Sequence, residues 1–78
     1  MKNNAIIKGR AGELLNALDA RTFICIYKQD KAGKEELICS TNLYNILANA
    51  QFLEAYKDYE VIGITLLIGT TAILIKEV

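Results

Sequence analysis

A stretch without charged side chains, Val61 to Ile75, constrains the fold of this chain more than any other feature. A membrane-spanning helix and a pair of strands joined by a tight turn are the two structures that compete for it. A spanning helix needs about 20 apolar residues, whereas this run is shorter and is interrupted by Gly63, Gly69 and the Thr70–Thr71 pair. Its many β-branched residues are typical of strands. The sequence therefore predicts a β-hairpin and no membrane span.

Gly69 is the residue that places the turn of this hairpin. With Gly69 and Thr70 as a two-residue loop, glycine at the first central position suits a type II′ turn, whose twist matches that of the flanking strands. Counting outward from this loop sets Leu66 opposite Ile73 in an antiparallel pair.

Alternation along the two strands divides the hairpin into two faces. We assign one face to the core beneath the helices, with Ile62, Ile64, Leu66, Ile73 and Ile75. The other face carries Val61, Leu67, Ala72 and Leu74. Two short helices can cover only one side of a sheet, so the second set is expected to be exposed on a monomer.

A second hairpin is predicted earlier in the chain. Thr22 to Lys28 and Glu35 to Ser40 read as strands, and a polar four-residue loop at 30–33 joins them, with Asp30 opening the turn. In this register Ile26 faces Leu37 and Ile24 faces Cys39, while Phe23, Cys25 and Ile38 lie on the opposite face. The two cysteines then point to opposite sides of the sheet and cannot bond, although a one-residue bulge would reverse that conclusion.

Two helices are predicted from apolar residues spaced at i, i+3, i+4 and i+7. The two stripes are Ala11, Leu14, Leu15 and Leu18, and Leu43, Ile46, Leu47 and Ala50. Ser40 is the expected N-cap of the second helix, and Phe52 to Tyr56 is expected to form a further turn or short helix. Residues 1–9 are expected to form an extended arm or a short strand, because Gly9 and Gly12 disfavour a helix there.

These elements define one small domain over residues 1–78. The expected fold class is α+β: a two-layer sandwich in αββαββ order, with a four-stranded antiparallel sheet of two β-hairpins and two helices on one face. Hydrophobic residues make up 53% of the chain, which exceeds the usual 45 to 50%. A chain of this size has little interior in which to bury that excess.

The residue types argue against catalysis and against a bound metal or cofactor. The chain has no histidine, the commonest general base and metal ligand. Cys25 and Cys39 lack the C-x-x-C spacing of a redox pair. The start of the chain, with Ala5 to Ile7 as its only apolar run, does not match a secretion signal. We therefore expect a cytoplasmic, non-enzymatic protein without cofactors.

A basic loop is the feature that keeps nucleic-acid binding open as an alternative. Lys28, Lys31 and Lys34 lie in and beside the loop of the first hairpin. Lysines near an aromatic residue can bind single-stranded nucleic acid. Glu35 and Glu36 follow in the same segment and cancel much of this field. Nine basic and nine acidic residues give the chain no net charge, so nucleic acid is the weaker alternative.

The exposed apolar face predicts self-association. Its expected members are Val61, Leu67, Ala72 and Leu74, beside Phe23 and Ile38. A contiguous apolar patch of this kind marks a contact surface, and a two-fold dimer is the commonest closed assembly. We expect a protein-interaction or accessory module that forms a homodimer, and a host protein is the other partner considered.

The order of the elements resembles that of small uncharacterised proteins encoded on bacterial phages and mobile elements. The resemblance covers Glu13 to Val78 and rests on ELLNALDARTFICIY, a D-x-x-G turn at Asp30 to Gly33, EELICS, the helix from Leu43 to Leu47, YEVIGI and AILIKEV. It implies a small accessory protein that acts through a surface, and it brings no functional residues with it.

Overall fold

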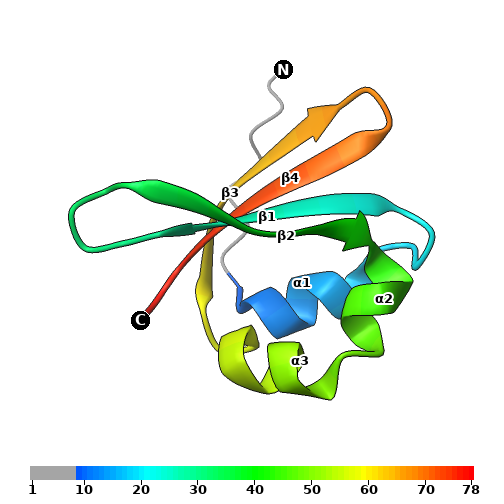
Figure 1. Ribbon diagram of the computed structural model, residues 1–78, viewed down its shortest axis with the longest axis horizontal. Coiled ribbons are helices and arrows are strands. Elements are labelled where there is room, and N and C mark those ends of the chain that lie inside the picture. The colour runs from blue at the N-terminus through cyan, green and yellow to red at the C-terminus, as the bar shows by residue number, and fades with distance from the viewer. Residues whose placement is uncertain (1–8) are drawn as a thin grey trace.

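The computed structural model describes residues 9–78, so the arm predicted for residues 1–9 lies, apart from Gly9, outside the described residues. The elements, in chain order, are α1 (Ala11–Ala17), β1 (Phe23–Gln29), β2 (Glu35–Asn42), α2 (Leu43–Leu47), α3 (Ala50–Tyr56), β3 (Glu60–Leu67) and β4 (Thr70–Lys76) (Figure 1). The predicted α+β class is confirmed, with four strands in a single sheet and three helices in the described part of the chain.

The sheet is mixed, and the prediction of a wholly antiparallel sheet is wrong. Its strand order is β2-β1-β4-β3. Both hairpins are antiparallel, but β1 and β4 pair in parallel at the centre. These two strands carry buried isoleucines, whereas β2 begins with two glutamates and lies at an edge. In this order β1 and β4, which contribute most to the core, each have a hydrogen-bonded neighbour on both sides.

The helical layer also differs from the prediction, because a third helix changes the order of the elements from αββαββ to αββααββ. The chain leaves α2 after five residues and starts α3 at Ala50, where the Asn49 side chain accepts a hydrogen bond from the Phe52 backbone N–H at 3.0 Å. Ser40 is not the N-cap of α2, because β2 continues to Asn42 and the helix begins after it. All three helices lie together on one side of the sheet (Figure 1).

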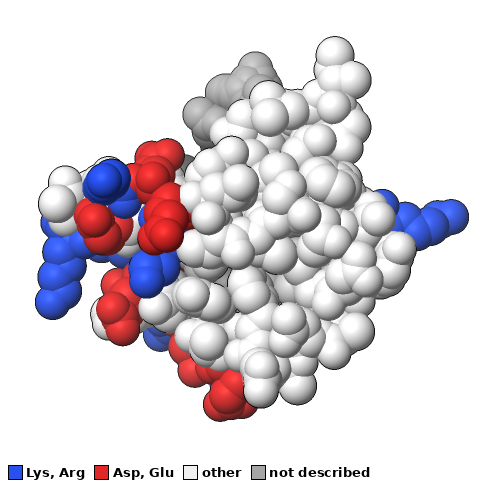
Figure 2. Space-filling model, viewed as in Figure 1, with Lys and Arg blue, Asp and Glu red and all other residues white. Residues whose placement is uncertain are grey.

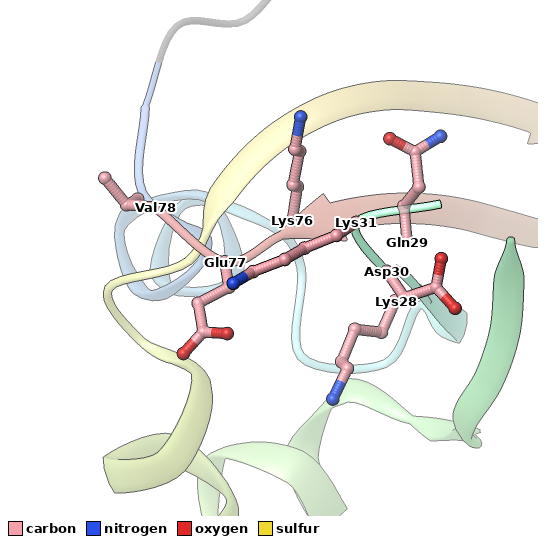
Figure 3. A pocket seen from close by; sticks show the side chains of 7 residues that line it. All are labelled: Lys28, Gln29, Asp30, Lys31, Lys76, Glu77 and Val78. Atoms are coloured by element: carbon pink, nitrogen blue, oxygen red, sulfur yellow. The ribbon is translucent and has the colours of Figure 1, made fainter. Parts of the chain in front are cut away.

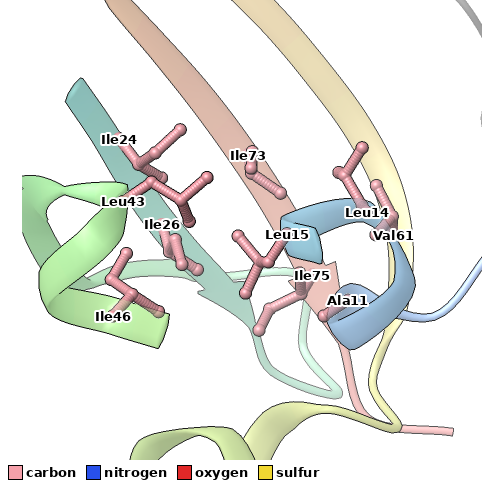
Figure 4. Packing of buried hydrophobic residues seen from close by; sticks show 10 residues of the cluster. All are labelled: Ala11, Leu14, Leu15, Ile24, Ile26, Leu43, Ile46, Val61, Ile73 and Ile75. Atoms are coloured by element: carbon pink, nitrogen blue, oxygen red, sulfur yellow. The ribbon is translucent and has the colours of Figure 1, made fainter. Parts of the chain in front are cut away.

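The core lies between the central strands and the helices α1 and α2. It consists of Ala11, Leu14, Leu15, Ile24, Ile26, Leu43, Ile46, Val61, Ile73 and Ile75 (Figure 4). The apolar positions predicted for both helices supply half of this cluster. Further along the chain, the Tyr56 ring lies 4.8 Å from that of Phe52 and 5.0 Å from that of Tyr59, and all three rings pack against the core.

The register of the β1–β2 hairpin differs from the prediction at two points. The loop holds five residues, because Gln29 pairs with Glu35, and a bulge follows between Ile26 and Tyr27. Each change moves the partner strand by one residue, so Ile26 pairs with Cys39 instead of Leu37. Two shifts of one residue restore the original alternation between faces. The predicted opposite orientation of the two cysteines therefore survives, and both are free thiols.

The turn of the β3–β4 hairpin is displaced by one residue from the predicted position. Ile68 and Gly69 form the loop, and Leu67 pairs with Thr70. Gly69 takes the second central position with φ of +75°, and Ile68 does not have positive φ. That sign pattern belongs to a type II turn and not to type II′. Leu66 consequently pairs with Thr71 instead of Ile73.

A bulge in β3 changes which side chains reach the core. The register shifts between Val61 and Gly63, so Val61 pairs with Ile75 and only 5% of its surface is exposed. The predicted exposure of Val61 is therefore wrong. Ile62, predicted to be in the core, is exposed beside the bulge. Leu66 shares the core side with Thr71, but it is 68% exposed, because it lies at the end of the hairpin beyond the helices.

Backbone hydrogen bonds join the start of the described chain, just before α1, to the edge strand β3. Arg10 forms an isolated antiparallel bridge with Glu60, and the Val61 N–H donates to the Gly9 carbonyl at 3.1 Å. The Gly12 N–H donates to the Lys57 carbonyl at 2.9 Å. A Cβ at Gly12 would lie only 3.0 Å from the Lys57 Cβ, so this close approach favours glycine.

Candidate functional site

The side of the sheet opposite the helices is covered by no other helix or strand of residues 9–78. Pairing across all four strands groups its outward residues into rows. The first is Leu37, Tyr27, Leu74 and Gly63; the second is Ser40, Cys25, Ala72 and Thr65. A third row continues with Asn42, Phe23, Thr70 and Leu67. These three rows carry no charged residue, and we call them the open face.

Four of the six residues predicted for an interface, Phe23, Leu67, Ala72 and Leu74, lie on the open face, but they are not equivalent. Leu67 is 58% exposed, Phe23 is exposed, and Ala72 and Leu74 are half-buried between neighbouring strands. Ile38 lies at the β1–β2 bulge and packs partly against the core cluster. Val61, the sixth, is in the core. The open face is therefore formed mainly by β1, β4 and the outer half of β3.

Sequence reasoning missed two residues that shape the open face. Leu37, on the edge strand β2, is 50% exposed and lies beside Tyr27. Gly63 leaves a notch beside Leu74, within an open depression of about 300 Å³ that Tyr27, Glu35, Thr65 and Ala72 also line. The signal for Gly63 was present, because glycine inside a strand marks a bulge or a close approach of another group.

Charge is distributed unevenly over the molecule. Figure 2 shows basic and acidic side chains gathered on the side where Figure 1 places the β1–β2 hairpin, and a nearly uncharged surface over α2 and the tip of the β3–β4 hairpin. The sequence explains this pattern, because residues 37–53 and 61–75 contain no charge. On the sheet, Glu35, Lys76 and Glu60 form a charged row that borders the open face at one end.

The tip of the β3–β4 hairpin is also apolar. Ile68 in the turn is fully exposed, and the neighbouring Leu66 and Leu67 are more than half exposed. Three consecutive exposed aliphatic side chains are unusual at a turn, where polar residues and glycine dominate. The tip therefore extends the uncharged surface beyond the end of β1.

The three lysines predicted as nucleic-acid contacts do not share one concavity. Lys28 and Lys31 line a concavity of about 540 Å³ with Lys76 and the C-terminal residues, while Lys28 and Lys34 line another with Asp30, Glu35 and Glu36. In Figure 3 the side chains of Lys28 and Lys76 point in opposite directions. They extend from opposite faces of the sheet, because Lys28 aligns with Ile75 and Lys76 follows it. The amines of Lys28 and Lys76 therefore do not converge on a common point.

The acidic side chain in the hairpin loop is already used by the turn. Asp30 Oδ1 accepts hydrogen bonds at 2.9 Å from the backbone N–H groups of Ala32 and Lys34. Gly33 adopts φ of +88°, in the left-handed region that glycine reaches without steric cost. At the α1–β1 connection, hydrogen bonds from the Arg21 backbone and guanidinium, together with its charge, lower the pKa of Asp19.

The two thiols occupy different environments. Cys25 lies on the open face, where its Sγ is 3.4 Å from the Ser40 Oγ. Cys39 faces the helical layer and packs against the core. Burial, followed by the charge of Cys25, raises the pKa of Cys39. Desolvation favours the neutral thiol over the thiolate. Because the thiolate is the reactive species, Cys39 should be less reactive at neutral pH than an exposed cysteine.

Within residues 9–78 no helix is long and apolar enough to cross a membrane, and no three Cys, Asp or Glu residues are grouped as metal ligands would be. No protein-family model, curated protein or solved structure matches the chain.

Proposed function

We propose that this chain is a small non-enzymatic binding module that contacts another protein through its open face. The observation that carries the proposal is the absence of charge from the open face, together with the large apolar side chains of Phe23, Leu37 and Leu67, which are exposed on three different strands. Antiparallel and mixed sheets commonly place polar residues on a solvated face. Apolar side chains gathered there instead are typical of an interaction site.

The positions of the reactive side chains support a role without catalysis. The Asp30 carboxylate is committed to the loop, Lys28 and Lys76 extend from opposite faces, and the Cys39 thiol faces the helices. A catalytic site needs such groups to converge on one substrate position. Location in the cytoplasm and an origin on a phage or mobile element belong to the same proposal and rest on the sequence.

A photo-crosslinking amino acid placed at Thr65, on the open face, tests the proposal in living cells. The matched control carries it at Glu54, which is exposed on α3. We expect a discrete covalent adduct from position 65 and none from position 54. An adduct of twice the chain mass identifies a second copy, and another defined mass identifies a different protein. Equal or absent labelling from both positions would refute an interaction through the open face.

Nucleic-acid binding through Lys28, Lys31 and Lys34 is the second candidate. One observation favours it: these lysines take no part in the ion pairs of the described chain, which join Asp19 with Arg21 and Glu54 with Lys57. Glu35 and Glu36 lie beside them and weaken the local positive potential. We therefore place it second to protein binding.

A further inference from the structure

We propose that the partner on the open face is a second copy of this chain, with Leu67 of each copy seated in the Gly63 notch of the other. This inference rests on the proposed function, because it names the occupant of the same surface. The two copies would meet face to face, related by a two-fold axis that lies between the sheets and runs across the strands at the level of Thr65.

The outward pairs on β3 and β4 are self-complementary in size. They are Leu67 with Thr70, Thr65 with Ala72, and Gly63 with Leu74. Each end of this segment thus has one leucine beside one smaller residue, and the middle has two small residues. A two-fold axis along the middle pair reverses the strand direction of the second copy. Leu67 then lies above the partner's Gly63, and Leu74 lies above the partner's Thr70.

The same axis gives matching contacts along β1. Cys25 aligns with Ala72, and Tyr27 aligns with Leu74. Reversing the strand direction therefore places Tyr27 of one copy above Phe23 of the other, and each Cys25 near the other Cys25. Aromatic rings meeting in this way can adopt the offset or edge-to-face geometries that contribute to interfaces.

Charge selects this arrangement over the other face-to-face two-fold. An axis parallel to the strands, between β1 and β4, would superpose the charged row on itself and bring Glu35 above the partner's Glu60. Like charges brought together across an interface are unfavourable. The axis across the strands leaves that row at the rim, opposite the uncharged end of the β3–β4 hairpin. The three uncharged rows are then buried, and Glu35, which also lines the depression, lies at the rim.

The size of the open face sets the expected strength of the dimer. Three rows spaced by about 7 Å on four strands about 4.8 Å apart cover roughly 400 Å² on each copy. Two such faces bury about 800 Å² by this projected area, which is below the 1,200 to 2,000 Å² of stable complexes. We therefore expect a weak dimer that dissociates in the micromolar range.

The first experiment uses the native Cys25 as a reporter of the axis. Sheets that pack face to face lie about 10 Å apart, so the two Cys25 Cα atoms are too far apart for a direct disulfide. Both side chains project into this gap, so a short thiol cross-linker such as dibromobimane is the appropriate probe. Each thiolate displaces one bromide from it. A Cys39→Ser chain, which keeps Cys25, should form a covalent dimer. The control is a Glu54→Cys chain in which both native cysteines are serine, and it should stay monomeric.

The second experiment fills the notch without disturbing the monomer. In Gly63→Val the added Cβ meets only the Leu74 Cβ, at 3.8 Å, which is an ordinary contact. We expect the dissociation constant from sedimentation equilibrium to rise at least tenfold, while the melting temperature of the dilute protein does not fall. Adding Leu67→Ala to Gly63→Val removes the side chain that would collide with valine and should recover most of the lost affinity.

The outcomes separate this inference from the proposed function. Wild-type protein that stays monomeric at high micromolar concentration, or dimerisation unaffected by Gly63→Val, overturns the reciprocal arrangement. If the photo-crosslinker at Thr65 then yields an adduct with a different protein, the open face keeps its proposed role and the partner is not a second copy. If that position yields no adduct, both proposals fail.

Discussion

Two adjacent residues of β4, Ile73 and Leu74, provide a direct test of how the two faces of the sheet are assigned. Ile73 faces the helices and is 1% exposed, whereas Leu74 lies on the open face between Tyr27 and Gly63. The substitutions Ile73→Glu and Leu74→Glu introduce the same side chain one residue apart. Their effects on the free energy of unfolding should differ by several kcal/mol.

The cost of Ile73→Glu has two parts. Losing a fully buried isoleucine costs about 1.5 to 3 kcal/mol. A carboxyl group buried without a partner has its pKa raised from about 4.3 to above 7, and at pH 7 this costs about 3.5 kcal/mol, because the buried group is then protonated and the unfolded one is not. The sum of about 5 to 7 kcal/mol is comparable with the whole stability of about 4 to 12 kcal/mol expected for a domain of 78 residues. The variant should be largely unfolded at pH 7.

Leu74→Glu should cost far less, because its carboxylate can reach water. Half-burial of Leu74 contributes about 1 kcal/mol, and glutamate is less favourable than leucine in a strand by less than about 1 kcal/mol. We expect a folded chain whose free energy of unfolding is reduced by about 1 to 2 kcal/mol. The same variant should lose self-association, because the charge would be buried in the dimer.

Urea unfolding followed by far-ultraviolet circular dichroism, at concentrations too low for dimers, measures both effects. Acidification provides an internal control: protonation of the introduced glutamate in the unfolded chain removes the cost of its burial, so Ile73→Glu should regain stability as the pH falls from 7 towards the ordinary glutamate pKa of about 4.3. A folded Ile73→Glu chain together with an unfolded Leu74→Glu chain would show that the faces are reversed. Two unfolded variants would show that Leu74 is fully enclosed within the monomer.

Three further predictions concern other parts of the chain. Gly12→Ala should lower the free energy of unfolding by up to about 2 kcal/mol in urea titrations, because crowding of the new Cβ against Lys57 at 3.0 Å costs about 1 to 3 kcal/mol and the higher helix propensity of alanine offsets about 1 kcal/mol of it. In a Cys25→Ser chain, burial keeps the pKa of Cys39 raised, so its modification by a thiol-reactive dye should begin at higher pH when folded than in urea. If the second candidate function holds, Lys31→Gln with Lys34→Gln should abolish retention on single-stranded DNA at low salt; absence of wild-type retention there would remove that candidate.

The helices and strands were predictable because they depend on local periodicity. The positions Leu14, Leu15, Leu43 and Ile46 were identified as core residues by their spacing alone, and all four are buried. Alternation likewise identified Ile73 and Ile75 as inward and Leu74 as outward. These assignments need only the side-chain period of a helix or a strand, and they do not depend on which element packs beside which.

Register was not predictable, because bulges leave little trace in a short sequence. The β1–β2 hairpin contains an extra loop residue and a bulge, and these cancel in their effect on side-chain orientation. The bulge at Ile62 has no such compensation, so Val61 reaches the core while Ile62 is exposed. The open face was therefore identified on β1 and β4 but misassigned at the start of β3.

The parallel pairing of β1 with β4 was also beyond sequence reasoning. It joins strands about 47 residues apart, as in the pair of Ile24 with Thr71, and parallel strands require a long crossover. Here β2, α2, α3 and β3 make that crossover. Two hairpins with short loops are compatible with several strand orders, and burial of the most apolar strands at the centre selects this one.

The chain has more apolar residues than its core contains, and some of the others lie on the open face. Between Val61 and Ile75 charge is absent from both faces of the β3–β4 hairpin, although the helices cover only one of them. Tyr27 and Leu74 on the central strands are partly shielded by their neighbours, whereas Leu37 and Leu67 on the edge strands are at least half exposed. Polar side chains at the two edge positions would leave the core intact and would improve solubility. Their apolar character is therefore not required by the fold, and it is accounted for if both positions are buried against a partner.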